Sequence, residues 1–293
     1  MKCFYHSADL DGHCSGAIVK GFYPDSEMIG INYGQAFPWN TIRQGEKVFM
    51  VDFSLQPFED MIRLNDLAEL IWIDHHKSAI EEYDAWQTIR SGVQKPIPGL
   101  RQVGRAGCEL TWVFIYGPGL SLPAAVRLLG RYDVWDLQDP DVLKFQYGMR
   151  QFNTWPDSSM IWDVLLSTDY LKSARLVYKI IRDGELLLNY IRQDNEKYCR
   201  AAAFETRLDG LLCIAINKML TNSQLFDSVW DPEKYDAMLT FGHRQGAWTV
   251  SLYSTREDVD CSSVCKARGG GGHKGAAGFQ CQELPFILPK TGK

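Results

Sequence analysis

Apolar and polar positions alternate in blocks along the first part of the chain, and three short apolar runs there predict buried strands. Each run ends in Asp or His, and the three are "KCFYH" to His6, "KVFMVD" to Asp52 and "LIWIDHH" to His76. A fourth apolar run, "EMIGIN", and helical patterns at about residues 11–22 and over "PFEDMIRLNDLA" lie between them. Strands that alternate with helices predict an α/β fold with a doubly wound, mainly parallel sheet.

The third run is unusual because Asp74, His75 and His76 stand together at the end of a buried strand. A buried polar group without a partner costs about 2–7 kcal/mol, so these side chains need partners. In open α/β sheets the ligand site lies beyond the carboxyl ends of the strands, near the point where strand order reverses. We therefore expect the polar residues of the three strand ends to meet at one edge of the sheet.

The rest of the chain predicts a helical connector and a second, smaller α/β domain. Residues 85–105, rich in Gly and Pro, predict a loop, and "AGCELTWVFIYG", "LPAAVRLLGRYDVWD" and all of residues 140–204 predict helices. Strands are predicted for "LLCIAIN", "YDAMLTFGHRQ" and "AWTVSLYST", with a tight turn at Gln245 and Gly246. The predicted division is 1–140 for a catalytic domain, 141–205 for the connector and 206–293 for a substrate-binding domain.

Composition limits the classes of partner. Hydrophobic residues make up 45% of the 293 residues and charged residues 23%, which is typical of a globular protein with a real core. The net charge of −5 argues against a stable complex with long duplex DNA, which needs many Lys and Arg contacts to phosphate. Nucleotides stay open as ligands, because carboxylates that hold metal cations present positive charge to a substrate.

Location and redox state are predicted from the N-terminal segment and the cysteines. The segment "MKCFYHSADLDG" reaches charged residues too early for a signal peptide, and no window approaches the ~20 apolar residues of a membrane span. We expect a cytoplasmic protein without a membrane partner, whose eight scattered cysteines are reduced. Cys261 and Cys265 near His273 are better explained as thiols on one face of a short helix than as zinc ligands, since no second pair completes a site.

The stretch "HSADLDG" places His6, Asp9 and Asp11 at a predicted strand-to-helix turn. Alone, these aspartates could equally be helix N-caps. Together with Asp52 and the DHH run at residues 74–76 they predict a cation site, because a core does not tolerate several like charges without cations between them. Mixed carboxylates and imidazoles suit two divalent ions about 3.5–4 Å apart, an arrangement that cleaves phosphate esters. Histidine ligation favours Mn²⁺, with Mg²⁺ or Co²⁺ as alternatives.

The order of five motifs is similar to that of the DHH phosphoesterase superfamily, in the branch that carries a DHH-associated C-terminal domain. These motifs are "HSADLDG", "VDFS", "IDHH", "RYDVWD" and, near the end of the chain, "GGGGHKGAAGF". The branch includes RecJ-type exonucleases, the nanoRNases or oligoribonucleases that degrade very short RNA, and cyclic dinucleotide phosphodiesterases. The resemblance covers both ends of the chain and leaves the helical middle as a spacer.

The resemblance also implies roles for the residues of these motifs. It assigns one ion to His6 and Asp9, the other to Asp11, His75 and Asp133, and a bridging position to Asp52. Catalytic roles fall to Asp52 and to His76, which would face the substrate phosphate or support a ligand. Asp136 is an alternative to Asp133 three residues further along the same helix. Asp74 is expected to orient a histidine or cap a turn.

The glycine-rich motif predicts an anion site in the C-terminal domain. Gly270, Gly271 and Gly272 let the backbone approach a phosphate, and His273 and Lys274 can add charge-assisted hydrogen bonds. A flexible hinge is the alternative. One departure from the family concerns an arginine expected in "SLYST", where this chain has Tyr253. Arg256 is the expected substitute, and Tyr253 could stack on a base.

The predicted function is a metal-dependent phosphodiesterase that hydrolyses short oligoribonucleotides to nucleoside monophosphates by a two-metal mechanism. The expected partner is a short single-stranded oligonucleotide or a dinucleotide, held between the two domains, and the protein could form a homodimer. Cyclic or linear dinucleotides and bisphosphate nucleotides of the pAp type are alternative substrates. A RecJ-like exonuclease of single strands and a nucleotide-binding regulator without turnover are less favoured.

Overall fold

The computed structural model describes residues 1–89, 95–157, 160–167 and 169–289. The chain divides into two compact units, Met1–Leu188 and Asn189–Lys293, and the division falls within one helix, α8 (Tyr170–Ala202). The predicted finer division at residues 140 and 205 stays a prediction.

The sheet of the first unit is entirely parallel, as the alternation of strands and helices predicts. It contains, in the order β2-β1-β3-β4, the strands β1 (Lys2–His6), β2 (Glu27–Ile31), β3 (Lys47–Val51) and β4 (Glu69–Ile73). Strand order reverses between β1 and β3, where ligands bind in folds of this kind. The prediction of a doubly wound α/β fold is confirmed.

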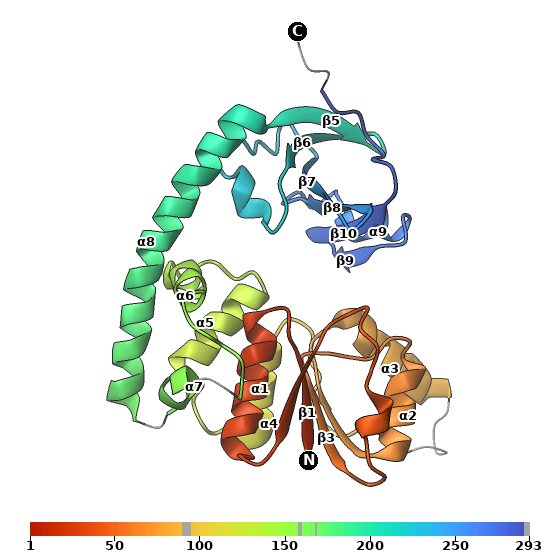
Figure 1. The fold of residues 1–293 in the computed structure, drawn as a ribbon, viewed down its shortest axis with the longest axis vertical. Helices are drawn as coiled ribbons and strands as arrows, with labels where there is room; N and C mark the ends of the chain where they lie inside the picture. Colours follow the sequence, from red (N-terminus) through yellow and green to blue (C-terminus); the bar gives the residue numbers. More distant parts are fainter. Residues whose placement is uncertain (90–94, 158–159, 168, 290–293) are drawn as a thin grey trace. The chain divides into compact units, whose positions relative to one another are not determined.

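Helices cover both faces of this sheet. Figure 1 shows α1 (Leu10–Phe22) and α4 (Gly107–Tyr116) on one face, and α2 (Glu59–Leu67) and α3 (Lys77–Ile89) on the other. Successive side chains of a strand point to opposite faces. Tyr5 of β1 accordingly packs with Val19 and Leu110, whereas its neighbour Phe4 packs in the core that contains Met61 and Trp72. The central strands β1 and β3 are therefore buried on both sides.

A helical layer extends the α1 side of the sheet. It contains α5 (Ala124–Asp133), α6 (Asp141–Met149), α7 (Met160–Leu165) and the first half of α8, which share a core around Phe145, Trp162 and Ile180. The prediction of continuous helix over residues 140–204 is wrong, because α6 ends at Met149 and the chain is irregular around Trp155 and Pro156. Proline disfavours helix at the residue before it, which explains part of this break.

The predicted loop at residues 85–105 is also partly wrong. Helix α3 continues to Ile89, and residues 90–94 of the expected loop lie outside the described residues.

The 3₁₀ turn η1 (Trp39–Thr41) precedes β3. Within the described part of the chain, no helix is long and apolar enough to cross a membrane.

The second unit contains a six-stranded sheet in which only β6 and β7 run parallel. In the order β5-β6-β7-β8-β10-β9, its strands are β5 (Phe204–Leu208), β6 (Leu211–Asn217), β7 (Ala237–Arg244), β8 (Ala247–Tyr253), β9 (Gly271–His273) and β10 (Ala276–Cys281). It also holds the 3₁₀ turn η2 (Ser223–Phe226) and the helix α9 (Cys261–Lys266). The three predicted strands and the turn at Gln245 and Gly246 are confirmed, while the end of the predicted connector helix at Phe204 is instead the start of β5.

The cysteines are thiols, and those of α9 are buried in the core of the second unit. Burial raises the pKa of Cys261 to about 12 and that of Cys265 to about 11, so both remain protonated near neutral pH. Zinc binds the thiolate rather than the thiol. The interpretation of this pair as buried thiols on a short helix therefore fits the structure.

Candidate metal centre

Three strand ends bring their polar residues to one edge of the first sheet. β1 ends at His6, Asp52 follows β3, and Asp74, His75 and His76 follow β4. The register aligns these ends, since Val51 pairs with Ile73 and the Asp52 amide donates to the Ile73 carbonyl at 2.8 Å. Asp52 has a φ of +55°, a left-handed conformation that Asp adopts more readily than most residues.

The first group of donor atoms joins His6, Asp9 and Asp52. His6 Nδ1 lies 2.9 Å from Asp9 Oδ2 and 3.6 Å from Asp52 Oδ2. Asp9 is the N-cap of α1 and accepts a hydrogen bond from the Gly12 amide through its other oxygen, at 2.9 Å. The N-cap and the ligand interpretations of Asp9 are therefore compatible, because each uses a different carboxylate oxygen.

The second group joins Asp11, His75 and Asp133. His75 Nε2 lies 3.3 Å from Asp133 Oδ2 and 3.8 Å from Asp11 Oδ2, and it also lies 3.2 Å from Asp52 Oδ1. The two oxygens of Asp52 thus face one group each. Asp136 is elsewhere, with Oδ2 at 3.0 Å from Arg131 Nε. Of the two aspartates of "RYDVWD", only Asp133 lies in the cluster.

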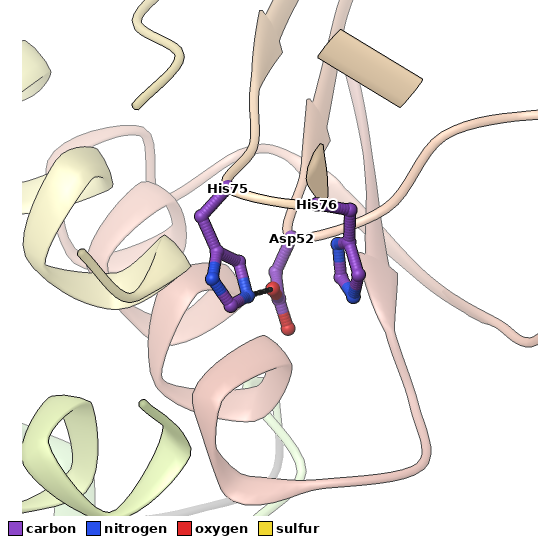
Figure 2. Close-up of side chains that lie close together, drawn as sticks. All are labelled: Asp52, His75 and His76. Carbon is purple, nitrogen blue, oxygen red and sulfur yellow. Dashed lines mark ion pairs between the residues drawn. The ribbon is translucent and has the colours of Figure 1, made fainter. Parts of the chain in front are cut away.

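His76 stands at the border of the cluster, and Figure 2 shows its ring beside Asp52 and His75, with all three side chains on the same side of the strand ends. Asp52, His75 and His76 form a third group of donors close enough to hold an ion. The Nδ1 atom of His76 lies 2.7 Å from Asp74 Oδ1. The same oxygen also accepts a hydrogen bond from the His75 amide at 2.7 Å. Asp74 therefore orients the histidine run, as expected.

Two further partners of the candidate ligands were not predicted. Asn32, in the loop after β2, has Oδ1 at 3.3 Å from His6 Nε2, which leaves Nδ1 of that ring toward the carboxylates. Metal-binding histidines commonly donate their second ring N–H to such an acceptor. The ring of Tyr33 is centred 5.7 Å from that of His6 and 6.2 Å from that of His76, so it covers this side of the cluster.

The N-terminus of α4 holds Asp11 in place. The amides of Gly107 and Cys108 donate to Asp11 Oδ2 and Oδ1 at 2.7 and 2.8 Å, and a helix N-terminus favours a negative charge. Glycine is required at 107 by close approach. A Cβ there would lie 2.7 Å from Asp52 Cβ and 2.8 Å from Asp52 Oδ1. The start of "GCELTW" therefore shapes the cluster, although its sequence predicts only a helix.

The cluster holds more negative charge than its own groups can balance. Burial and the neighbouring carboxylates of Asp11 and Asp9 raise the pKa of Asp52. Burial and the carboxylates of Asp11 and Asp52 likewise raise the pKa of Asp133. Burial lowers the pKa of His6, but hydrogen bonding to Asp52 and Asp9 outweighs it and raises that pKa to about 11. Without cations the cluster takes up protons.

The donor set fits two divalent cations. Four carboxylates, from Asp9, Asp11, Asp52 and Asp133, carry four negative charges, which equal the charge of two such ions. Neighbouring donors around a cation with ligands at ~2.1 Å lie about 3 Å apart, close to the separations within both groups. His6 Nδ1 faces Asp9 Oδ2 at 2.9 Å and Asp52 Oδ2 at 3.6 Å, and buried Asp52 Oδ1 faces His75 Nε2 at 3.2 Å. Carboxylate and imidazole donors that face one another in this way can hold a cation between them.

The predicted anion site of the second unit has a different character. Gly271 and His273 belong to the edge strand β9, paired with β10, and Gly272 has a φ of +138°. A Cβ on Gly270 would lie 2.1 Å from the Gly278 carbonyl oxygen. Gly270 and Gly272 are thus needed for the close packing and the backbone conformation of a tight hairpin, whereas a Cβ on Gly271 would meet no atom within 4 Å. Whether its backbone also binds phosphate stays a prediction.

The predicted cations of that site already have protein partners. Lys274 Nζ lies 3.1 Å from Glu257 Oε2, in an exposed pair. Arg256 forms a two-pronged pair with Asp258, at 2.6 and 2.9 Å, and lies 3.2 Å from Asp236. The hydroxyl of Tyr253 donates to the Thr221 carbonyl at 3.2 Å. A substrate phosphate would have to compete with these carboxylates for Arg256 and Lys274.

Comparison with known proteins gives distant likenesses. No family model matches the chain. A curated relative, the uncharacterized protein R106 of Acanthamoeba polyphaga mimivirus, is 24% identical over 265 residues, which cover 84% of this chain and 56% of the relative. The chain thus spans little more than half the length of that protein.

Several solved structures align over almost the whole chain. A pGpG-specific phosphodiesterase from Vibrio cholerae has a TM-score of 0.45 at 12% identity, covering 95% of this chain and 92% of its own. RecJ exonuclease bound to manganese has a TM-score of 0.44 at 16% identity, covering 95% of this chain and 84% of its own. An exopolyphosphatase-related protein from Bacteroides fragilis has a TM-score of 0.49 at 13% identity, covering 97% of this chain and 87% of its own. With TM-scores below 0.5, these likenesses are too distant to support an assignment of function. Any such assignment depends on the geometry of the cluster.

Proposed function

We propose that this protein is a metal-dependent phosphodiesterase of the DHH type, with short oligoribonucleotides as substrates and nucleoside monophosphates as products. One observation carries the proposal: two groups of carboxylate and imidazole donors lie at the switch point of a parallel sheet, and Asp52 between them turns one oxygen toward His6 and the other toward His75. Two divalent cations in such a site polarise the phosphoryl oxygens and acidify a water molecule for in-line attack. Mn²⁺ is the cation we expect, because the set includes imidazoles.

The protein's own contribution is to hold the donors in fixed positions. Asp11 is held by the amides of Gly107 and Cys108, and His6 by Asn32. Burial lowers the pKa of His76, but hydrogen bonding to Asp74 outweighs it and raises that pKa, which favours the protonated ring. A protonated His76 at the border of the cluster can donate to a phosphoryl oxygen, which is the role we propose for it.

Substrate length is the second part of the proposal. A binding site for the end of a chain gives short and long oligonucleotides the same benefit, and the acidic protein offers a long strand little further attraction. We expect kcat/KM to be highest for two to about five nucleotides. Linear dinucleotides such as pGpG therefore remain within the range of expected substrates.

The test is a substrate screen on the purified full-length chain with Mn²⁺. It compares a dinucleotide, RNA of increasing length, a cyclic dinucleotide, pAp and inorganic pyrophosphate, and it follows the release of monophosphate or phosphate. We expect release from the dinucleotide and the short RNAs, and none after treatment with a chelator. A kcat/KM that climbs steadily with RNA length would indicate a long-strand exonuclease instead. No turnover of any of these would contradict an enzymatic role.

A further inference from the structure

A tryptophan two residues after the candidate ligand Asp133 has an unexpected backbone conformation. Trp135 follows α5 two residues after Asp133, and its φ is +59°. A positive φ is uncommon for any residue with a side chain and is an outlier for a bulky one. Strained residues that persist in a fold concentrate at functional sites.

The hydrogen bonds around Trp135 define the end of α5. The Trp135 amide donates to the Tyr132 carbonyl at 3.0 Å, and the Asp136 amide donates to the Arg131 carbonyl at 2.8 Å. This is the Schellman pattern, in which the left-handed position is usually glycine. Glycine at residue 135 would satisfy the backbone with less strain, so the local fold does not explain why tryptophan is present.

Packing does not explain the indole either. Trp135 is 46% exposed, and it lies outside every hydrophobic cluster formed by the described residues. Its neighbours Tyr132 and Leu137 do pack against the core of the helical layer. The Tyr132 ring, centred 5.5 Å away, supports one side of the indole, and the Arg131–Asp136 ion pair fixes the turn. The result is a large aromatic surface held in a defined place.

The position of this surface relates it to the cluster. Two residues of chain span at most about 7 Å, so the Cα of Trp135 is within that distance of the Cα of Asp133. Asp133 Oδ2 is itself 3.3 Å from His75 Nε2. A nucleotide carries its base one ribose away from its phosphate, which places the base of a bound substrate within reach of this turn.

We propose that Trp135 is a stacking platform for a nucleobase, and that the site therefore accepts base-bearing phosphodiesters in preference to inorganic polyphosphates. The proposal rests on the proposed function only for the position of the phosphate. Stacking of a base on an aromatic side chain tolerates any base, because every base has a π-face. Trp135 would thus add affinity for nucleotides without selecting a particular sequence.

The test measures binding rather than turnover, on the full chain loaded with Mn²⁺. The ligands are 5′-AMP and ribose 5-phosphate, which differ by the base, and the variants are Trp135→Gly and Trp135→Phe. We expect Trp135→Gly to weaken AMP binding by about 5- to 150-fold, the range of one stacked base, and to leave ribose 5-phosphate binding unchanged. Trp135→Phe should keep part of the AMP affinity.

Stability provides the second readout. Trp135→Gly places the preferred residue at the end of α5, so its urea midpoint should be no lower than that of the natural chain. Gln245→Gly is the matched control, because it relieves a φ of +53° in the second unit and should leave AMP binding unchanged. Trp135→Asn, which also suits a left-handed conformation, should lose the same AMP affinity as Trp135→Gly.

Three results would overturn the proposal: an equal loss of affinity for AMP and ribose 5-phosphate, no loss of affinity for either, or a lower urea midpoint in both Trp135→Gly and Trp135→Asn.

Because the test needs no hydrolysis, it is independent of the proposed activity. A chain that binds AMP through Trp135 but hydrolyses nothing would refute only the phosphodiesterase, and a chain that hydrolyses dinucleotides with unchanged AMP binding in Trp135→Gly would refute only the platform.

Discussion

The donor cluster of the first unit and the glycine hairpin of the second unit are both rich in charged residues, but they balance charge in different ways. In the cluster, Asp11 and Asp52 are buried and surrounded by further carboxylates. Around the hairpin, Lys274 pairs with Glu257 in an exposed position, and Arg256 pairs with Asp258. The cluster therefore requires cations or protons to balance its charge, whereas the charged groups around the hairpin pair within the chain.

This difference indicates where the sensitivity of the protein should lie. Removing one member of a buried charged network leaves the others unbalanced, which has large effects. Exposed ion pairs contribute about 0–1 kcal/mol, so their loss has small effects. We therefore expect substitutions at the strand ends to be far more damaging than substitutions in the hairpin.

The largest effect is expected from Asp52→Ala. Its two oxygens face separate donor groups, so its loss should release both cations and abolish turnover. The affinity for Mn²⁺ should fall by more than about 100-fold, beyond the cost of losing a supporting residue. Metal content of the purified variant, measured by mass spectrometry, checks this result.

His76→Ala is the matched variant at the same strand ends. It should keep nearly all of the metal while slowing turnover, because we assign this ring to the substrate phosphate. Equal metal loss in the His76→Ala and Asp52→Ala variants would show that His76 is a ligand as well, as its place in the third donor group allows.

The next effect is expected from Gly107→Ala. A methyl group at this position would lie 2.8 Å from Asp52 Oδ1 and 3.0 Å from Asp11 Oδ2, so the carboxylates must shift. We expect Mn²⁺ affinity to fall by about 10- to 100-fold, as for loss of a supporting contact. Gly119→Ala is the control, since a Cβ there meets no atom within 4 Å. Similar Mn²⁺ affinities in the two variants would refute the role of α4.

A third prediction concerns pH. The pKa of His6 is raised to about 11, so near neutral pH its ring holds a proton that a cation must displace, and the raised pKa values of Asp52 and Asp133 add to this competition. The affinity for Mn²⁺ should therefore rise with pH between about 6 and 9, by up to one decade per pH unit for each proton displaced. Mn²⁺ titrations at several pH values measure the slope.

His6→Asn sharpens the pH prediction, because it removes one of the titrating groups while keeping a polar side chain. Its slope should be smaller than that of the natural chain, by up to one proton. An affinity that falls with rising pH, or a slope that this variant leaves unchanged, would contradict the assignment of His6 as a ligand.

The smallest effect is expected in the hairpin. His273→Ala should raise KM for dinucleotides by less than about 10-fold, leave kcat and metal content unchanged, and flatten the dependence of kcat/KM on RNA length. Glu257→Ala, which frees Lys274 from its ion pair, should lower KM or leave it unchanged. A loss of metal in His273→Ala would contradict the separation of the two regions.

Much of the first unit was predictable from the sequence, because its signals are local. Apolar runs ending at His6, Asp52 and His76 predict strands, and the topology of parallel sheets brings their ends together. The local signals for the three strands are therefore enough to predict that the polar residues at their ends lie close together. Even the preference for Asp133 over Asp136 agrees with the geometry, although it came from a family resemblance.

The residues that support the cluster could not be predicted in the same way, since their roles depend on tertiary contacts. Asn32 lies 26 positions from His6, and Gly107 lies 96 positions from Asp11. The segment "NYG" indicates only a turn, and "RAGC" indicates only the start of a helix. Neither pattern indicates a contact with a residue of the cluster. The short strands β9 and β10 were missed for a related reason, because glycine-rich segments predict loops.

The most direct test of the account is a crystal structure of the full chain with Mn²⁺, using anomalous scattering from the metal. The account predicts two anomalous peaks about 3.5–4 Å apart. One peak should lie beside His6 and Asp9, the other beside Asp11, His75 and Asp133, and both should be in contact with Asp52. A single peak, or two peaks that do not share Asp52, would contradict it.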